Sequence, residues 1–282
     1  MGILGRRAGG HHVLRTSEWI IVGYAAYLLG LAPFRAISRG RRTRLLAVAS
    51  AMVGVVFLTA SLPDSLVVRT FRTWLPLVYM LVCYWLTGLY FVDPQPEFES
   101  RFAAFDRRVR ERLGAGHFDE TAPRVVLELL EASYLGCYVM VPAGLLVITL
   151  HGAGYAAEGY LRTVLLAELC CYGMLPWIRT RPAWVLEPNS PLSKRRLLMR
   201  RVSLAVTRNA STCANTFPSG HAAGALATAL VVASVWSLAG AAFFVLALGI
   251  IVGSVVGEYH YAGDAIAGVA VGVAAWALVS LM

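Results

Sequence analysis

The sequence predicts an all-α protein, a polytopic membrane helical bundle of about eight spans. Hydrophobic residues make up 58% of the 282 residues and charged residues only 15%, which excludes an ordinary soluble globule. Several uncharged runs approach the roughly 20 residues that cross a bilayer as a helix. The net charge of +9 comes almost wholly from arginine, which suits phosphate and anionic lipid. We expect membrane lipids and no nucleic acid as partners, because no basic segment stands apart from the apolar runs.

The N-terminal part of the chain, residues 1–160, holds four of the predicted spans. These apolar runs are residues 18–34, 45–62, 74–92 and 125–150, and a strongly basic loop at 35–44 follows the first of them. Between the third and fourth, Phe98, Phe102 and Phe105 recur at helical spacing against arginines. This pattern predicts an amphipathic interfacial helix near residues 97–114, also placed to cover the mouth of a site. The alternative is a solvated loop helix without a lipid role.

The C-terminal part, residues 161–282, holds the other four spans. They are residues 161–175, 222–238 and 241–256, with a short Ala-Gly turn before the last of these, and the run that follows Asp264. Glu168 lies inside the fifth span, where a carboxylate is costly and is usually functional or paired. We expect it to bond a substrate hydroxyl, or a tyrosine such as Tyr134 or Tyr138.

The sixth span begins with the segment Thr216-Phe217-Pro218-Ser219-Gly220-His221. Pro218 suits the first turn of a helix, and Thr216 or Ser219 can cap it. The first amides of a helix carry a partial positive charge, so Ser219 and Gly220 can hold a phosphate while His221 donates a proton to a leaving oxygen. The alternative is an ordinary helix start with an interfacial histidine.

A second polar segment carries His260 and Asp264, which are four residues apart. On a helix they share one face, so the carboxylate can hold one ring nitrogen of the imidazole. Two apolar runs separate His221 from His260, so the chain crosses the membrane and returns. Both histidines are therefore expected at the same surface.

The segment Arg179-Thr180-Arg181-Pro182 follows the fifth span, and no span fits between it and Pro218. It must face that same surface. Two guanidinium groups, helix-end amides, two imidazoles and a carboxylate then meet there. This inventory suits phosphoryl transfer, in which positioning and charge stabilisation supply most of the catalysis.

Arg181-Pro182, Pro218-Ser219-Gly220-His221 and His260 with Asp264 resemble, in order, the three signature motifs of the type 2 phosphatidic acid phosphatase (PAP2) superfamily, which is related to vanadium haloperoxidases. The resemblance runs from about Leu165 to the C-terminus and implies a PAP2-like catalytic core over residues 161–282. It also implies roles for single residues: His260 as the nucleophile that forms a phosphohistidine, Asp264 as its orienting partner, His221 as general acid, and Arg181, Ser219 and Gly220 as phosphate ligands.

Two positions depart from the superfamily pattern, because Met174 and Ser254 stand where it usually has a lysine and an arginine. Arg179 is the nearest substitute for the first cation. Candidates for the second are Lys194, Arg195, Arg196, Arg200, Arg201 and Arg208. A third motif without its arginine is similar to the phosphotransferase branch, which includes inositol phosphorylceramide and sphingomyelin synthases.

These observations predict metal-independent hydrolysis of a lipid phosphate, either phosphatidate-like or a polyprenyl phosphate or diphosphate. Glu168, Arg208 and Glu258 are candidate substrate contacts. No cofactor or metal is expected, because the five cysteines lack metal-ligand spacing and there is no Gly-rich nucleotide loop. One alternative is a lipid head-group phosphotransferase that uses the same site. Another is a non-catalytic lipid-binding or transport protein with a decayed site.

The expected location is a multi-pass position in the plasma membrane. The predicted topology puts 19 of the 25 arginines and lysines on the side of the motifs, so the positive-inside rule places the site in the cytoplasm. The superfamily resemblance points to the opposite face, to which we give more weight. The sequence does not indicate an oligomeric state.

Overall fold

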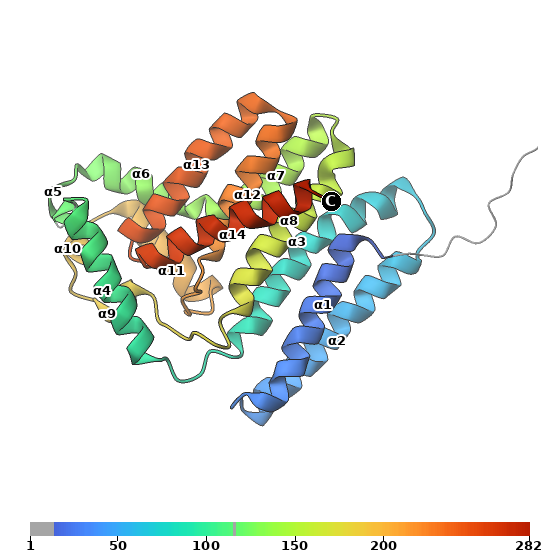
Figure 1. Cartoon of the computed structure of the whole chain (residues 1–282), viewed down its shortest axis with the longest axis horizontal. Coiled ribbons are helices and arrows are strands. Elements are labelled where there is room, and N and C mark those ends of the chain that lie inside the picture. The colour runs from blue at the N-terminus through green and yellow to red at the C-terminus, as the bar shows by residue number, and fades with distance from the viewer. Residues whose placement is uncertain (1–13, 115–116) are drawn as a thin grey trace, which may run out of the picture.

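The computed structural model describes residues 14–114 and 117–282, and it is helical almost throughout, as the sequence predicts (Figure 1). The one isolated β-bridge in this part of the chain joins Thr180 and Asn215. The helices are, in order, α1 (Thr16–Leu31), η1 (Ala32–Phe34), α2 (Arg39–Ser61), α3 (Leu66–Gly88), α4 (Pro96–Arg112), α5 (Phe118–Thr121), α6 (Arg124–Leu135), α7 (Cys137–Leu150), η2 (Gly154–Ala156), α8 (Ala157–Gly173), α9 (Ala183–Leu186), α10 (Pro191–Lys194), α11 (Leu198–Ala210), α12 (Gly220–Val235), α13 (Ser237–Val256) and α14 (Ala262–Ser280).

Five of the described helices are long and apolar enough to cross a membrane: α1 with η1, α2, α3, α13 and α14. The pair α6 and α7, bent by 59°, makes a sixth if it is counted as one span. The chain is thus a multi-pass membrane protein. The count of eight stays a prediction, because α12 has only 16 residues and α8 has 17, among them Glu158, Arg162 and Glu168.

Several predicted boundaries were wrong because hydropathy does not mark where a helix begins. The basic segment at 35–44 is mostly the start of α2, since Ser38 caps that helix by accepting a hydrogen bond from Arg41 N at 3.3 Å. The break between α12 and α13 falls at Trp236, and the predicted Ala-Gly turn lies inside the first turn of α13.

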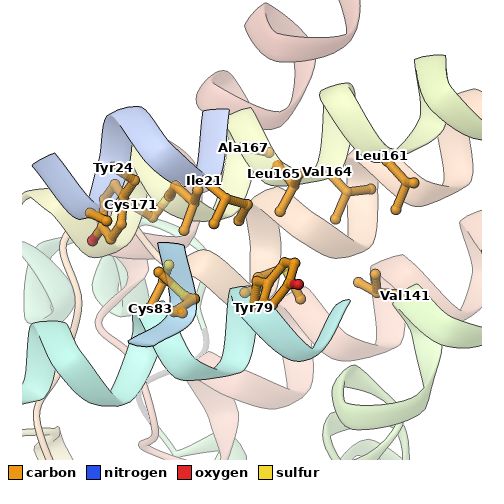
Figure 2. Packing of buried hydrophobic residues seen from close by; sticks show 14 of the residues in the cluster. Ile21, Tyr24, Tyr79, Cys83, Val141, Leu161, Val164, Leu165, Ala167 and Cys171 are labelled. Atoms are coloured by element: carbon orange, nitrogen blue, oxygen red, sulfur yellow. The ribbon is translucent and has the colours of Figure 1, made fainter. Parts of the chain in front are cut away.

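Helix α8 joins the two halves of the molecule. It packs against α1 and α3 on one side and against α12 and α14 on the other. Figure 2 shows Ile21 of α1, Cys83 of α3 and Leu165 of α8 in one buried cluster. The cluster is apolar, so the N-terminal helices dock on the C-terminal half chiefly through the hydrophobic effect and close packing.

Polar contacts also join α1 to α3 and to α8. Arg72 donates to Glu18 through Nε at 2.8 Å and Nη2 at 2.6 Å. Ser17 donates to the carboxylate of Glu158 on α8 through its amide at 2.7 Å and its hydroxyl at 2.8 Å. The buried carboxylate of Glu18 therefore has both a cationic partner and hydrogen bonds.

Helices α12 and α14 approach each other through their backbones. Gly268 and Gly272 on α14 face the carbonyl oxygens of Ser219 and Ala223, and a methyl group built on Gly272 would lie 2.7 Å from the second of these oxygens. Ser219 N also donates to Asp264 O at 2.9 Å. The starts of the two helices, where the motif histidines lie, are thereby held together.

Candidate active site

The two motif histidines meet as the sequence predicts. His221 is the second residue of α12, His260 lies just before α14, and Nδ1 of the first is 3.2 Å from Nε2 of the second. His260 is only 4% exposed. Residues 39 positions apart thus place two imidazoles within reach of one reacting atom.

Local structure fixes both rings. Ser219 is the N-cap of α12, and its hydroxyl accepts from Ala222 N at 3.3 Å. Pro218 therefore precedes the cap and does not begin the helix as expected. The carbonyl of Ser254 accepts from the amides of Tyr259 at 2.9 Å and His260 at 3.0 Å, which holds the loop before α14.

Asp264 lies beside His260 but does not make the expected hydrogen bond. Its Oδ2 is 3.6 Å from His260 Nδ1, too far for one. The same oxygen accepts from Asn215 Nδ2 at 2.8 Å and from Tyr261 N at 3.0 Å. Because Tyr261 is the N-cap of α14, the carboxylate fixes the start of that helix first.

Asn215, which sequence reasoning missed, ties the three motif segments together. Its Nδ2 donates to Thr180 Oγ1 at 3.0 Å as well as to Asp264, and its amide donates to Thr180 O at 2.8 Å. A single buried asparagine in a loop has no periodicity that would reveal this role. Its position just before the Phe217-Pro218 segment was the one available signal.

The two predicted phosphate-binding arginines do not line the cavity that holds the histidines. Arg181 donates to Glu99 on α4 through its amide and Nε at 2.9 Å each and through Nη2 at 2.7 Å. Arg179 donates from its side chain to the carbonyls of Asp93 at 3.3 Å and Pro176 at 3.1 Å. The hydrogen bonds from Arg181 hold the pKa of the Glu99 carboxyl below its usual range, so this pair is ionised at neutral pH.

Helix α4 covers all three motif segments. Besides the Glu99 pair, Phe102 stacks on Phe217 with ring centroids 5.0 Å apart and lies 5.7 Å from Tyr261. Asp106 accepts a hydrogen bond from Ala262 N at 2.5 Å. A helix is therefore present where an interfacial helix was expected near 97–114, and its position at a membrane surface stays a prediction. Part of its apolar face packs on protein, because aromatic rings of the motif loops occupy it.

Glu258, a candidate substrate contact, belongs to a buried ion network. Arg200 donates to Glu258 at 2.8 Å, to Glu131 at 3.0 Å and to the carbonyl of Gly257 at 2.8 Å. Ser190 also donates to Glu258 at 3.0 Å. Burial raises the pKa of Glu258 above its usual value. With these partners the carboxylate fixes the loop before α14 and does not face the cavity.

The same network reaches His221 through two rings. Tyr259 donates to Glu131 at 2.7 Å and stacks on Tyr134 with centroids 3.9 Å apart. Tyr134 in turn lies 5.6 Å from the His221 ring. Tyr134 thus supports the general-acid candidate and does not pair with Glu168 as expected.

A cavity of about 480 Å³ opens beside the histidines. Its walls are mainly apolar and aromatic, and they include Glu168, His221 and His260. Glu168 is the one acidic residue and no lysine or arginine is present among the described lining residues. The cavity therefore fits a lipid chain better than a free anion.

Arg208 lies outside this cavity, on a basic groove of about 630 Å³ that also contains Lys194, Arg196 and Arg201. Its guanidinium lies 5.3 Å from the ring of Trp184. Trp184 lines both the groove and the cavity. Arg208, a predicted substrate contact, is thus separated from the cavity that holds the histidines by the indole ring of Trp184.

Within residues 14–114 and 117–282, no group of three or more His, Cys, Asp or Glu side chains is arranged to hold a metal ion. Fold and site together define a multi-pass helical membrane protein with a buried two-histidine site at the start of two packed helices. Residues 157–282 match the sequence model of the PAP2 superfamily, so the chain is similar to that superfamily over its C-terminal part. No curated protein and no solved structure matches the chain. PAP2 proteins are generally phosphatases that act on phosphate monoesters, and the match therefore points to an enzyme of the phosphatase type.

Proposed function

We propose that this protein hydrolyses a lipid phosphate, phosphatidate-like or polyprenyl, through a phosphohistidine and without a metal. The observation that carries the proposal is the 3.2 Å approach of His221 Nδ1 to His260 Nε2 beside an apolar cavity. A lipid chain fits these walls, and its phosphate then lies next to both imidazole rings.

The reaction has two steps. His260 Nε2 forms a bond to phosphorus while the ester P–O bond breaks, and His221 gives its Nδ1 proton to the departing alkoxide. Water then attacks the phosphohistidine, His221 accepts a proton from that water, and phosphate leaves. The tautomer that this requires has the Nδ1 proton of His260 facing Asp264, whose negative charge stabilises the ring as it becomes cationic.

The amides of Gly220 and His221 support phosphate binding, because the first amides of a helix lack intrahelical acceptors. The Ser219 hydroxyl is committed as a cap acceptor and contributes its proton. Arg181 joins once the phosphate replaces Glu99, since each anion presents two oxygens that can accept from one guanidinium. Arg179 remains a more distant positive charge.

The test is phosphate release by the purified full-length chain from phosphatidate, polyprenyl phosphate, polyprenyl diphosphate and sphingoid phosphates. Quenched reactions should contain an acid-labile, base-stable phosphoprotein that is absent from His260→Ala. Candidate acceptor alcohols in the same assay distinguish the head-group transferase, which forms a new lipid in place of free phosphate. If neither product nor phosphoprotein forms with any lipid, the site is decayed.

We also propose that the site faces the extracytoplasmic side of the plasma membrane. The charge count that opposes this is confounded, because Arg41, Arg195 and Arg200 are held by protein acceptors. Labelling a cysteine introduced on the exposed face of α4 with a membrane-impermeant reagent in intact cells tests the orientation, provided that the native thiols prove silent. Protection of that cysteine until the cells are lysed would place the site in the cytoplasm.

A further inference from the structure

The carboxyl group of Glu168 fits into a slot on the surface of α12. It projects from α8 onto the first two turns of α12, where Gly220 and Gly224 stand one turn apart. A methyl group built on Gly220 would lie 2.7 Å from Glu168 Oε2, and one on Gly224 would overlap Oε1. Any larger residue at these positions would displace the carboxyl, so α12 leaves room for it beside His221.

One oxygen of the carboxyl group in this slot lacks a protein partner. Glu168 is 6% exposed, and within the described part of the chain its Oε2 has no hydrogen-bond partner. An isolated buried carboxyl is costly, and such groups are normally paired or functional. Among the cavity residues there is no lysine or arginine to pair with it. Tyr172, which also lines the cavity, can donate to the carboxyl group, and Oε2 is left for a group that enters the cavity.

The chemistry of that group follows from its neighbours. In its ionised form the Glu168 carboxylate cannot pair with a phosphate anion, because two anions in an apolar cavity repel each other strongly. A hydroxyl, amine or amide N–H can donate to the carboxyl. Rotation about the last torsion of Glu168, which has a broad energy well, presents either oxygen to the cavity.

We infer that Glu168 accepts a hydrogen bond from a hydroxyl or amino group that the lipid carries beside its phosphate-bearing carbon. This inference rests on the proposed function and narrows its substrate class to phosphates of long-chain 2-hydroxy or 2-amino alcohols. Lipids with an ester or ether at that position leave Oε2 of Glu168 without a donor and bind less well.

The experiment compares the rates of hydrolysis, with water as the only acceptor, of a matched pair of substrates. One is 1-O-hexadecyl glycerol 3-phosphate with a free 2-hydroxyl, and the other is the same lipid as its 2-methyl ether. The wild-type protein should prefer the hydroxyl form by at least about tenfold in kcat/KM, which is typical of a buried hydrogen bond to a charged group. Glu168→Met should remove the preference and Glu168→Gln should retain part of it. Cys170→Ser, on an exposed part of the same helix, should behave like the wild type.

A binding readout separates this inference from the proposed function. Quenching of the cavity tryptophans Trp85 and Trp184 reports binding of the phosphate-free 1-O-hexadecyl glycerol and its methyl ether, with or without turnover. If wild-type protein binds both equally, or hydrolyses both phosphates equally, the inference is wrong even though catalysis stands. If binding discriminates and no lipid is turned over, the proposed function fails alone.

An added acceptor alcohol tests whether the hydrogen-bond donor to Glu168 belongs to the acceptor and not to the lipid substrate. If the acceptor supplies it, Glu168→Met lowers the ratio of transfer to hydrolysis and leaves the hydroxyl-to-methoxy ratio near one in both proteins. That result would overturn the assignment to the lipid substrate.

Discussion

In the N-terminal helices the buried carboxylate of Glu18 accepts from Arg72 and from the amide of Arg15. Around the cavity, by contrast, Glu168 Oε2, His260 Nδ1 and Asp264 Oδ1 are buried without hydrogen-bond partners in the described part of the chain. Folded proteins rarely tolerate such atoms without a reason. One region therefore has buried polar groups that complete the fold, while in the other the cavity residues Glu168 and His260 each keep an atom that no described protein group satisfies.

The contrast is one of degree, since atoms of Arg35, Tyr79 and Arg162 are also buried without partners. Arg35 has another contact, however, because its guanidinium lies 3.7 Å from the centre of the Trp177 ring. Three titratable side chains with unpartnered atoms, Glu168, His260 and Asp264, belong to the cavity or its motif segments. The substitutions below test whether loss of activity and loss of stability separate in the same way.

The largest effect should follow loss of the nucleophile. His260→Ala should lower kcat by about 10⁴-fold or more, because no other group can form the covalent intermediate. Phosphate release and a melting curve check this together, and the melting temperature should change little. His151→Ala, which removes a ring stacked on Trp236, is the control, and turnover by the His260 variant within tenfold of wild type would contradict the assignment.

Asp264→Asn should come next. The amide oxygen can still accept from Tyr261 N and preserve the start of α14, but the negative charge beside His260 is gone. We expect kcat to fall by about 10² to 10⁴ with a nearly unchanged melting temperature, by analogy with other orienting carboxylates. A large drop in stability together with normal turnover per folded molecule would make this residue purely structural.

Glu18→Ala should lower stability and leave turnover unchanged, which is the opposite of what we expect for the His260 and Asp264 variants. It leaves the Arg72 guanidinium largely buried and unpaired, which should cost about 3 kcal/mol of stability, while kcat per folded molecule stays the same. Asp64→Ala is the matched control, because its pair with Arg69 is exposed, at 76% and 60% of the two side chains, and should contribute less than about 1 kcal/mol. Thermal unfolding in detergent measures both, and equal losses would contradict the prediction.

Asp106 should make the unfolding free energy depend on pH. Burial raises its pKa to about 6, above its value in the unfolded chain. The folded protein therefore binds the proton more tightly, and the unfolding free energy should fall as pH rises from about 4 to 6 and then level off. The melting temperature should drop by a few degrees over this range. Asp106→Asn should abolish the drop and Glu111→Gln, on the same helix, should not.

Glu99→Gln should have the smallest effect. The amide still accepts from the Arg181 backbone, but the guanidinium is held less tightly and becomes more available to phosphate. We expect KM to fall by about threefold with kcat unchanged. Because the pKa of Glu99 is already below its usual range, the effect should be constant from about pH 6 to 8. Glu97→Gln is the control, and an unchanged KM in both variants would remove Arg181 from phosphate binding.

Much of the site could be predicted because its signals are local or follow from counting spans. The helix start at Gly220 is marked by its cap, and two apolar runs between His221 and His260 require both to lie at one surface. Neither inference depends on which helices are neighbours. The placement of both imidazoles at one surface therefore followed from the sequence, whereas their contact also requires α12 to pack against α14.

The contacts of the arginines could not be predicted, because they depend on which segment covers the motif loops. Nothing in the sequence around residue 99 indicates that Glu99 pairs with Arg181, or that Arg200 turns inward to Glu131 and Glu258. Long-range ion pairs carry no periodicity. For the same reason Asp264 was expected to bond His260, although Asn215 and Tyr261 N are nearer to its carboxylate.

The contact of Gly268 and Gly272 with the backbone of α12 has a consequence for anyone who would re-engineer this protein. The distance between the two imidazole rings depends on the close backbone contact at Gly268 and Gly272. One methyl group added at either position would therefore widen that distance. Substitutions at exposed positions of α14, such as Ile266 and Val273, would leave this backbone contact in place, whereas a side chain added at Gly268 or Gly272 would push the two helices apart.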